Sequence, residues 1–279
     1  MSTLLKPKSY LRPIPAAKKN SLVAEILSAE KISTICENAN CPNRAECFSD
    51  GTASILALGN ICTRNCKFCA VKKGSPLPPD ETEPTRIANA VKKLNLSSVV
   101  ITSPTRDDLE DGGAKHLADC VFAVKKECPN CKVELLIPDF KGNEKSLEII
   151  LNSPVDCIAH NIEMPKRLYG ELRDFADFDR SINILRFLTM SRIMQVKTGF
   201  MLGLGETEDE IFDLIKTFSK ILNVSSVTLG QYFQPTKASY PVQKYYEEND
   251  FAKFADFARK SGIKKVLAGV FVRSSYKNA

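Results

Sequence analysis

Histidine is scarce in this 279-residue sequence, which contains only His116 and His160. Since zinc sites commonly combine cysteine with histidine, this scarcity counts against a zinc-binding module. The sequence also lacks a run of about eighteen apolar residues, which a membrane-spanning helix would need. Its N-terminal stretch, rich in proline and lysine, has no apolar centre of the kind found in signal peptides. These absences predict a cytoplasmic protein that does not bind a membrane.

The net charge is small and dispersed. It amounts to +6 at pH 7, and lysine and arginine are spread along the chain rather than gathered in one block. Such an excess favours acidic partners without requiring nucleic acid, and we expect no nucleic-acid partner. A hydrophobic content of 43% over 279 residues is enough for a full core. We expect one domain with attached ends.

Cysteine, by contrast, is abundant and clustered. Six of the ten cysteines form two triplets, Cys36-x4-Cys41-x5-Cys47 and Cys62-x3-Cys66-x2-Cys69. In a reducing compartment, clustered cysteines are more typical of metal ligands or reactive thiols than of disulfides. Three thiolates from one tight loop can hold three corners of a cubane iron–sulfur cluster and leave the fourth iron open. A zinc knuckle is the alternative, but no fourth ligand follows the second triplet at a matching spacing.

Strand-like and helix-like segments alternate from Thr52 onward. Strands are expected at 53–59, 97–103, 133–138, 155–161, 195–202 and 225–233. Helices are expected near 86–94, 114–126, 145–151, 181–190, 209–222 and 250–260. Six strands alternating with helices favour a parallel sheet that closes or nearly closes. The fold class expected is α/β, a partial (β/α)6 TIM-like barrel with N- and C-terminal extensions.

The chain is expected to divide into three parts. Residues 1–50 form an N-terminal extension that carries the first triplet, 51–245 form the barrel, and 246–279 form a C-terminal extension ending in "RSSYKNA". The proline- and lysine-rich residues 1–20 are expected to lie extended over the surface. The apolar run "VLAGVFV", at 266–272, is expected to anchor the tail against the barrel.

Polar sequences stand where the expected strands end. In chain order they are "CTRNCKFC", "TSPTRDDLEDGG", "PDFKG", "HNIE", "GLGETEDE" and "GQYFQPTKASYP". Because βα barrels place their chemistry on the loops that leave the C-terminal ends of the strands, these loops should share one face. That face is predicted to hold the functional site.

The second triplet, with Phe68 directly before its last cysteine, resembles the signature of the radical S-adenosylmethionine (SAM) superfamily. The resemblance implies a 4Fe–4S cluster held by Cys62, Cys66 and Cys69. It also implies that the open iron is chelated by the amino and carboxylate groups of SAM, and that reductive cleavage of SAM releases a 5′-deoxyadenosyl radical.

The first triplet narrows the resemblance to one family. Together with "CPNRAEC", "NICTRNCKFC", "RDDLEDGGA", "HNIE", "MLGLGE", "GQYFQPT" and "RSSY", it is similar to lipoyl synthase over nearly the whole chain. That resemblance implies a second, auxiliary 4Fe–4S cluster held by Cys36, Cys41 and Cys47, with Ser275 as the fourth ligand. The implied reaction inserts two sulfur atoms at C6 and C8 of a protein-bound octanoyl-lysine, and the auxiliary cluster donates the sulfur.

The partners are also implied by the resemblance. They are octanoylated lipoyl carrier domains (the glycine cleavage H protein and 2-oxoacid dehydrogenase E2 subunits), reduced ferredoxin or flavodoxin, and an iron–sulfur carrier that rebuilds the auxiliary cluster.

The chemistry of C–H bonds agrees with the implied sulfur insertion. An unactivated aliphatic C–H bond cannot be deprotonated by a tuned side chain, so a cofactor must carry the chemistry.

Further site residues are expected in the polar loops. Phe68, Asn161, Glu163 and Lys197 are expected near SAM, and Arg273 near the auxiliary cluster. For each polar residue, the alternative is a side chain whose hydrogen bonds are satisfied at a strand end. No catalytic residue is expected beyond the cluster ligands.

The remaining histidine and cysteines are assigned to packing or to the surface. His160, on an apolar strand, is expected to be a hydrogen-bonded core histidine. Cys120 and Cys157 are expected in the core, and Cys128 and Cys131 are expected to be surface thiols.

Two other functions are weighed against this one. A biotin-synthase-like radical SAM enzyme acting on a free small molecule would share "CTRNCKFC", but it gives no reason for the first triplet or Ser275. A zinc-binding module for nucleic acid would account only for the cysteines and the positive charge. The sequence departs from the lipoyl synthase pattern at Ser239, where a histidine is usual, and this concerns substrate docking rather than the cluster ligands.

Overall fold

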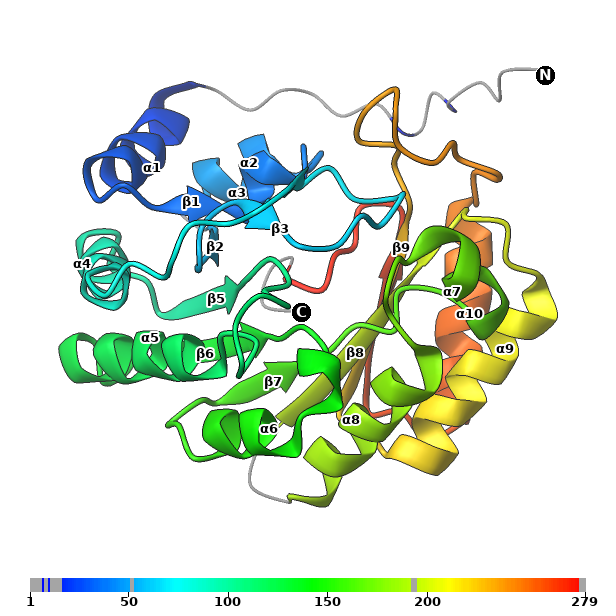
Figure 1. The fold of residues 1–279 in the computed structure, drawn as a ribbon. Helices are drawn as coiled ribbons and strands as arrows, with labels where there is room; N and C mark the ends of the chain where they lie inside the picture. The colour runs from blue at the N-terminus through cyan, green and yellow to red at the C-terminus, as the bar shows by residue number, and fades with distance from the viewer. Residues whose placement is uncertain (1–6, 8–9, 11–16, 51–52, 192–194, 276–279) are drawn as a thin grey trace.

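The centre of the computed structural model is a curved, mostly parallel sheet (Figure 1). The structure describes residues 7, 10, 17–50, 53–191 and 195–275. The strand order is β1-β2-β5-β6-β7-β8-β9-β10. The strands are β1 (Ser33–Thr34), β2 (Ser54–Leu56), β5 (Ser98–Thr102), β6 (Lys132–Leu136), β7 (Cys157–Ala159), β8 (Gln195–Leu202), β9 (Ser226–Gln231) and β10 (Lys265–Gly269). Since β1 and β10 end the order, the described strands form an open barrel.

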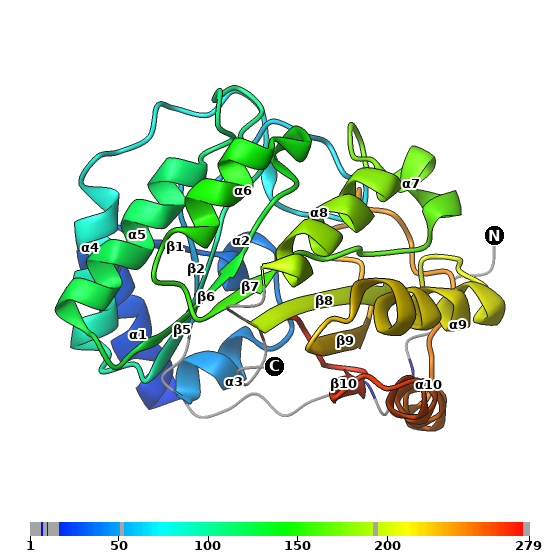
Figure 2. The same cartoon turned by 90° about the horizontal axis from the view of Figure 1, so that it is seen from below.

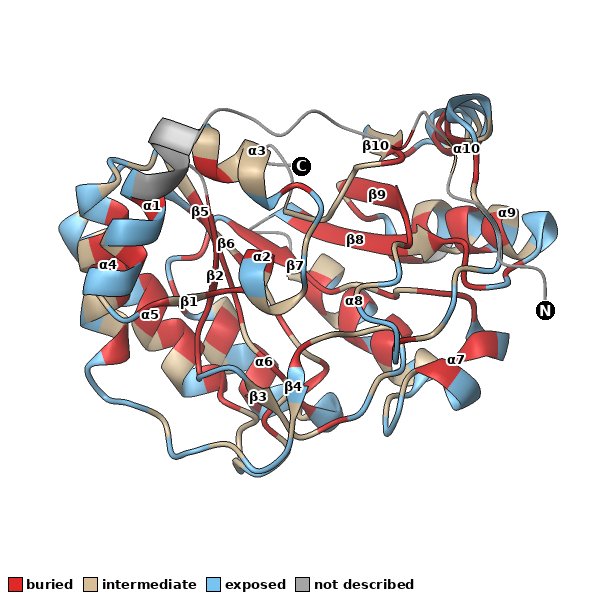
Figure 3. Cartoon of the chain, turned by 90° about the horizontal axis from the view of Figure 1, so that it is seen from above, coloured by how far each residue is buried: buried red, intermediate tan, exposed pale blue. Residues whose placement is uncertain are grey.

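All six expected parallel strands are present, from β2 to β9, each shorter than or equal to its predicted segment. Strands β5, β7, β8 and β9 are largely buried, and helices cover the outer face of the sheet (Figure 3). The sequence prediction missed one parallel strand. The apolar run after residue 264 forms β10, which pairs with β9 from Lys265 to Gly269.

The helices that follow the strands lie outside the sheet (Figure 2). They are α4 (Glu83–Lys93), α5 (Ala114–Glu127), α6 (Glu144–Leu151), α7 (Lys166–Leu172), α8 (Phe178–Met190), α9 (Glu208–Thr217) and α10 (Glu248–Lys260). Helix α9 shows why they form where they do. Thr207 and Glu210 make a reciprocal capping box at its start, and Ile211, Leu214 and Ile215 form its buried side. The sequence prediction missed only the short α7.

The N-terminal part packs across one end of the barrel. It contains α1 (Ala17–Ala29), α2 (Ile35–Asn38) and α3 (Arg44–Ser49), and β1 runs antiparallel to β2. The extended path predicted for residues 1–20 is wrong where it can be compared. Helix α1 already begins at Ala17, and Tyr10 is only 3% exposed, with its hydroxyl donating to Gln231 Oε1 at 3.2 Å. The rest of that stretch lies outside the described residues.

The cysteines outside the triplets are a mixed result. Cys120 and Cys157 are buried in the core, as predicted. Cys131 is 2% exposed, so its assignment as a surface thiol is wrong. It ends the turn between α5 and β6, where its N–H donates to the Cys128 carbonyl at 2.9 Å, and burial raises the pKa of its thiol to about 11. No helix among the described residues is long and apolar enough to cross a lipid bilayer.

Candidate active site

The second cysteine triplet lies on a loop that leaves the C-terminal end of β2. Two short strands, β3 (Ile61–Cys62) and β4 (Lys72–Lys73), pair in parallel and tie the two ends of this loop together. The backbone N–H of Gly74 also donates to the Cys62 carbonyl at 3.1 Å. The three thiols are therefore held on one compact loop.

These three thiols line one cavity of about 170 Å³, which we call the loop cavity. Burial, assisted by the neighbouring Cys69 and Cys62 and opposed by the charge of Arg173, raises the pKa of Cys66 to about 11. The other walls come from the C-terminal ends of β5 and β6 and from the loop after β7. From those segments they include Thr102, Leu136, Asp139, Asn161 and Glu163. Arg64 and Phe68 of the cysteine loop and Arg173 at the end of α7 complete the lining.

A second cavity of about 310 Å³, the tail cavity, lies beside the first. Its walls include Cys36 and Cys41 of the first triplet and the C-terminal segment from Val272 to Ser275. The two cavities share a wall. Its residues are Ile35, Phe68, Cys69, Thr102, Leu136, Asn161 and Glu163. The fold thus brings the second triplet, two cysteines of the first and the chain's last described residues to one place.

The first triplet is positioned by local caps and by contacts with the tail. The Thr34 side chain caps α2 by accepting from the Glu37 N–H at 3.2 Å. The Cys41 N–H donates to the Cys36 carbonyl at 3.0 Å, and burial raises the pKa of the Cys36 thiol, as does the charge of Cys41. Cys47 lies on α3 and, within the described part of the chain, is not among the residues that line either cavity.

The C-terminal segment runs through the inside of the barrel over β9. Asn43, which precedes α3, donates its side-chain N–H to the Phe271 carbonyl at 2.7 Å. The Phe271 ring stacks on Phe233, with centroids 5.6 Å apart and planes 21° apart. At Gly230 a Cβ atom would lie 2.1 Å from the Val272 carbonyl oxygen, so only glycine allows the tail to approach β9 this closely.

Ser274 and Ser275 are placed differently. The Ser274 hydroxyl oxygen lies 3.3 Å from the Asn161 side-chain nitrogen, from which it accepts a hydrogen bond. Ser275 follows it and lines the tail cavity with Cys36 and Cys41. Residues 276–279, including the rest of the "RSSY" motif, lie outside the described residues.

Asn161 and Glu163 lie at the shared wall on the loop after β7. Glu163 has a positive φ of 69°, and its backbone continues the pairing with β8: its N–H donates to Gly199 at 3.1 Å, and its carbonyl accepts from Met201 at 2.8 Å. Burial raises the pKa of Glu163, whereas the nearby Arg173 lowers it. The Asn161 Oδ1 atom is buried and has no hydrogen-bond partner among the described residues. An unpartnered acceptor here fits a polar ligand that carries donors.

Lys197 and Arg273 are not placed alike. Arg273 lines the tail cavity, and its guanidinium lies 5.3 Å from the centre of the Phe233 ring. Lys197 is buried in β8, and in the described chain it lines neither of the two cavities. Its Nζ atom lies 2.7 Å from Glu134 Oε2 and 3.3 Å from the Ser274 carbonyl oxygen. The structure therefore brings Lys197 to the tail rather than to the cysteine loop.

Sequence reasoning missed the arginine inside the second triplet. Arg64 is 4% exposed and joins two carboxylates: its Nε lies 2.6 Å from Asp107, and its NH2 lies 2.7 Å from Asp139. Burial alone would raise the pKa of Asp139, but the hydrogen bonds and charge of Arg64 lower it to about 2. The arginine clamps the cysteine loop to the loops that follow β5 and β6. The signal was visible, because one arginine stands between the cysteines and an aspartate lies in the loop after each of the two neighbouring strands, β5 and β6.

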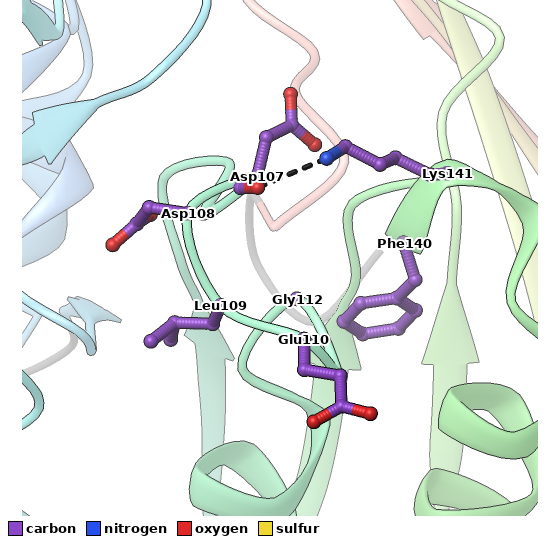
Figure 4. A pocket seen from close by; sticks show the side chains of 7 residues that line it. All are labelled: Asp107, Asp108, Leu109, Glu110, Gly112, Phe140 and Lys141. Carbon is purple, nitrogen blue, oxygen red and sulfur yellow. Dashed lines mark hydrogen bonds between the residues drawn. The ribbon is translucent and has the colours of Figure 1, made fainter.

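A further pocket shares Asp107 with this clamp (Figure 4). It is lined by Asp107, Asp108, Leu109, Glu110, Gly112, Phe140 and Lys141. Lys141 crosses it and donates to the Asp107 carbonyl at 2.9 Å. Its acidic rim stands beside the Arg64 clamp. Its residues belong to the polar loops "TSPTRDDLEDGG" and "PDFKG", but none of them is among the individually predicted site residues.

The donor set of the second triplet consists of three thiols that line one cavity. A polynuclear iron–sulfur cluster takes thiolate ligands on several of its irons, and three thiols on one wall can supply them. The sulfur-only donor set of the second triplet fits iron–sulfur chemistry.

Comparison with known proteins points the same way. Residues 56–218 match the Radical SAM superfamily. The chain is 45% identical to the lipoyl synthase of Caldicellulosiruptor saccharolyticus over 263 residues, which cover 93% of this chain and 92% of the relative. It is 46% identical to the lipoyl synthase of Buchnera aphidicola subsp. Cinara cedri, covering 99% and 89%, and 43% identical to that of Pseudomonas aeruginosa strain PAO1, covering 97% and 83%.

Solved structures share the fold at low sequence identity. Methylornithine synthase aligns with a TM-score of 0.55 at 12% identity, covering 98% of this chain and 86% of that one. A maturase of the [FeFe]-hydrogenase aligns with a TM-score of 0.58 at 13% identity, covering 91% and 64%. These likenesses confirm the predicted fold class.

Proposed function

The chain belongs to the lipoyl synthase family of the radical SAM superfamily, and from that premise we propose which residues hold its cofactors. It is an enzyme that inserts two sulfur atoms at C6 and C8 of a protein-bound octanoyl-lysine. When bound, one 4Fe–4S cluster supplies the electron that cleaves SAM to a 5′-deoxyadenosyl radical, and the auxiliary 4Fe–4S cluster supplies the sulfur. Every other contribution comes from the chain's own residues.

Cys62, Cys66 and Cys69 are proposed to hold the SAM-cleaving cluster. Their thiols line one cavity, and the Arg64 clamp and the β3–β4 pairing fix their loop. Phe68, which directly precedes Cys69, lines both the loop cavity and the tail cavity.

Asn161 and Glu163 are proposed to contact SAM. Asn161 offers a buried carbonyl oxygen without a partner among the described residues, and Glu163 offers a carboxylate at the same wall. Both are acceptors, and SAM carries an amino group and ribose hydroxyls that donate. The placement of Lys197 supports a role at the tail instead of a contact with SAM.

Cys36, Cys41, Cys47 and Ser275 are proposed to hold the auxiliary cluster, with Arg273 close to it. The proximity of Cys36, Cys41 and Ser275 in one cavity supports this set. Ser275 is favoured over Ser274 because the Ser274 hydroxyl already accepts from Asn161. An alkoxide-type oxygen would be a poorer partner for iron than a thiolate, so Ser275 would hold its iron less firmly than the three cysteines would hold theirs.

The octanoyl chain is proposed to lie across the shared wall of the two cavities. Besides its polar groups, the tail cavity offers apolar surface from Ile35, Leu136, Met201, Tyr232 and Phe233. Each methylene buried there contributes about 0.8 kcal/mol. A carbon radical formed beside the loop cavity would then meet sulfur at short range, before water can quench it.

The substrate of this family is an octanoylated carrier protein, and the reaction needs a reductant. We propose the glycine cleavage H protein and 2-oxoacid dehydrogenase E2 subunits as carriers, and reduced ferredoxin or flavodoxin as the electron donor. An iron–sulfur carrier is proposed to rebuild the auxiliary cluster. We propose that the enzyme and these partners act in the cytoplasm.

We also propose a division of the chain into three parts. Residues 1–50 are the N-terminal extension, 51–245 the barrel and 246–279 the C-terminal extension. The contacts of α2 and α3 with the tail support a joint role of both extensions at the auxiliary cluster.

Two triple variants test the division of labour between the clusters. Replacing Cys62, Cys66 and Cys69 with alanine should abolish 5′-deoxyadenosine formation and leave about four irons per chain out of about eight. Replacing the three cysteines of the first triplet with alanine should leave SAM cleavage intact but stop sulfur insertion into an octanoyl-lysine peptide. Mass spectrometry of the peptide measures that insertion. Dithiolated product from the first-triplet variant would contradict the proposal.

Ser275 is tested by two substitutions that keep both triplets. Ser275→Ala should bind iron and cleave SAM but transfer sulfur poorly. Ser275→Cys should hold the auxiliary cluster more tightly and release sulfur more slowly, because a thiolate replaces an oxygen on iron. Equal yields of dithiolated product from the parent chain, Ser275→Ala and Ser275→Cys would contradict the assignment of Ser275 as a ligand.

A further inference from the structure

A buried ion pair spans the inside of the barrel beneath the two cavities. Lys197 on β8 is 3% exposed, and its Nζ atom lies 2.7 Å from Glu134 Oε2 on β6. Strand β7 lies between β6 and β8 in the sheet, so the two side chains meet inside the barrel across an intervening strand. Neither residue is a cluster ligand, and neither lines the loop cavity or the tail cavity in the described chain.

Such a pair needs a reason beyond stability. A buried ion pair is commonly no more stabilising than apolar side chains of the same volume. Here the pairing is also incomplete, because Glu134 Oε1 is buried with no hydrogen-bond partner in the described part of the chain. The pair therefore holds an ammonium group in the barrel interior at some expense to stability.

The ammonium group makes one more contact, and it is with the C-terminal tail. An ammonium has three donors, and Lys197 directs a second one to the backbone carbonyl of Ser274, 3.3 Å away. Asn161 holds the same residue from its other side by donating to the Ser274 hydroxyl at 3.3 Å. Ser274 is thus fixed by both backbone and side chain, and the next residue, Ser275, lines the tail cavity with Cys36 and Cys41.

We propose that Lys197, with Glu134 as its counter-ion, is a positioning residue that clamps the Ser274 backbone and so holds the Ser275 oxygen at the auxiliary cluster. This inference rests on the proposed function, in which Ser275 is the fourth ligand of that cluster. With the auxiliary cluster bound, the clamp would hold the tail backbone beside it independently of any bond from Ser275 to iron. In this proposal Asn161 and Glu163 contact SAM, whereas Lys197 helps to retain the auxiliary cluster.

The test isolates the auxiliary cluster. In a chain that carries Cys62→Ala, Cys66→Ala and Cys69→Ala, the remaining iron belongs to the first triplet. Into this background one introduces Lys197→Met together with Glu134→Gln, which removes both charges and leaves no buried charge unpaired. Two readouts follow anaerobically: the rate of iron loss to a chelator, and hydrogen exchange of a peptide covering residues 265–275.

The double substitution should accelerate both readouts about tenfold, since a hydrogen bond from a charged donor accounts for at least that ratio. A matched control is Lys132→Met, which removes a lysine charge from the exposed start of β6, a position that lines neither cavity in the described chain. The control should leave both rates at the parent value. Rates in the double variant equal to those of the control would overturn the clamp.

Ser275→Ala in the same background separates this inference from the proposed function. If Ser275→Ala does not change iron loss, the ligand assignment itself fails. If Ser275→Ala accelerates iron loss and the double variant does not, the ligand stands and the clamp is overturned. Should the double variant fail to fold, Lys197→Gln replaces it. Its amide still reaches toward Glu134 but ends one atom short of Nζ, and an unchanged tail exchange rate in that variant would equally overturn the clamp.

Discussion

Replacing Gly230 with alanine should detach the C-terminal tail without disturbing the barrel. Gly230 lies on β9, where the tail crosses the inner face of the sheet. Its backbone conformation suits any residue, since its φ is not positive, so the substitution acts only through the added methyl group. That methyl group meets the tail and not another strand.

The size of the effect follows from the contact. The new Cβ would lie 2.1 Å from the Val272 carbonyl oxygen, whereas real Cβ atoms essentially never come within 3.0 Å of a neighbour, so the tail must move by about 0.9 Å. It would also lie 3.1 Å from the Arg273 guanidinium. Forcing a methyl group into a packed site costs about 1–3 kcal/mol, which corresponds to about 5- to 150-fold in the fraction of attached tail.

The assay compares Gly230→Ala with a second glycine-to-alanine substitution. Gly170 lies on α7, and a methyl group added there would have nothing within 4 Å, so Gly170→Ala changes the same atoms without a collision. Gly230→Ala should still form 5′-deoxyadenosine but should lose auxiliary iron faster, exchange the tail peptide faster and yield less dithiolated product. Gly170→Ala should behave like the parent chain.

A Gly230→Ala chain that retains auxiliary iron and makes product at the rate of Gly170→Ala would refute this prediction. That result would mean either that the tail does not lie over β9 in solution or that its position does not matter for sulfur insertion. Loss of SAM cleavage in Gly230→Ala would point to a disturbed barrel and would also contradict an effect confined to the tail.

Three further predictions concern other parts of the chain. Arg64→Met removes the buried partner of Asp107 and Asp139 and leaves Asp139 paired with the partly exposed Arg180, 3.1 Å away, so the unfolding free energy from denaturant titration should fall by about 3 kcal/mol. Asp139→Asn in the same chain should restore part of that loss; no recovery would contradict the Arg64 clamp. Burial lowers the pKa of His160 to about 4 in the folded chain, whereas an unfolded histidine has an ordinary pKa near 6.5. Between pH 6.5 and pH 4 the unfolded chain therefore binds a proton at His160 more readily than the folded chain does. The stability of the cluster-free chain should therefore be complete above pH 6.5 and decline by about 3 kcal/mol toward pH 4, a decline that His160→Phe should lack. Since the net charge is +6, binding of an acidic carrier domain should weaken between low and high salt, and more so than binding of a short octanoyl-lysine peptide; equal affinities across that range would exclude electrostatic steering.

Much of the fold could be predicted because its signals are local in the chain. Apolar segments of strand length alternate with helical periods, and those patterns located six strands that the structure contains. The β10 strand was taken as an anchoring run, since its pairing with β9 depends on where the chain returns after α10. The first turn of α1 was missed because proline and lysine dominate the residues around it.

The reaction class, too, was determined by the sequence alone. Cysteine spacing within a triplet is a property of one loop, so it survives whatever the rest of the chain does, and paired triplets with a terminal "RSSY" are specific to one family. The comparisons confirm that family.

Only the tertiary structure decided which side chains meet across the barrel. Lys197 was expected near SAM because its strand leads into one of the polar loops. Its ammonium group instead lies inside the barrel against Glu134 and the Ser274 carbonyl. Likewise, nothing near Gly230 in the chain announces that Val272 passes over it. The physical reason is that such contacts depend on strand register, sheet curvature and the path of a tail more than forty residues away, and none of these is written in a local pattern of residues.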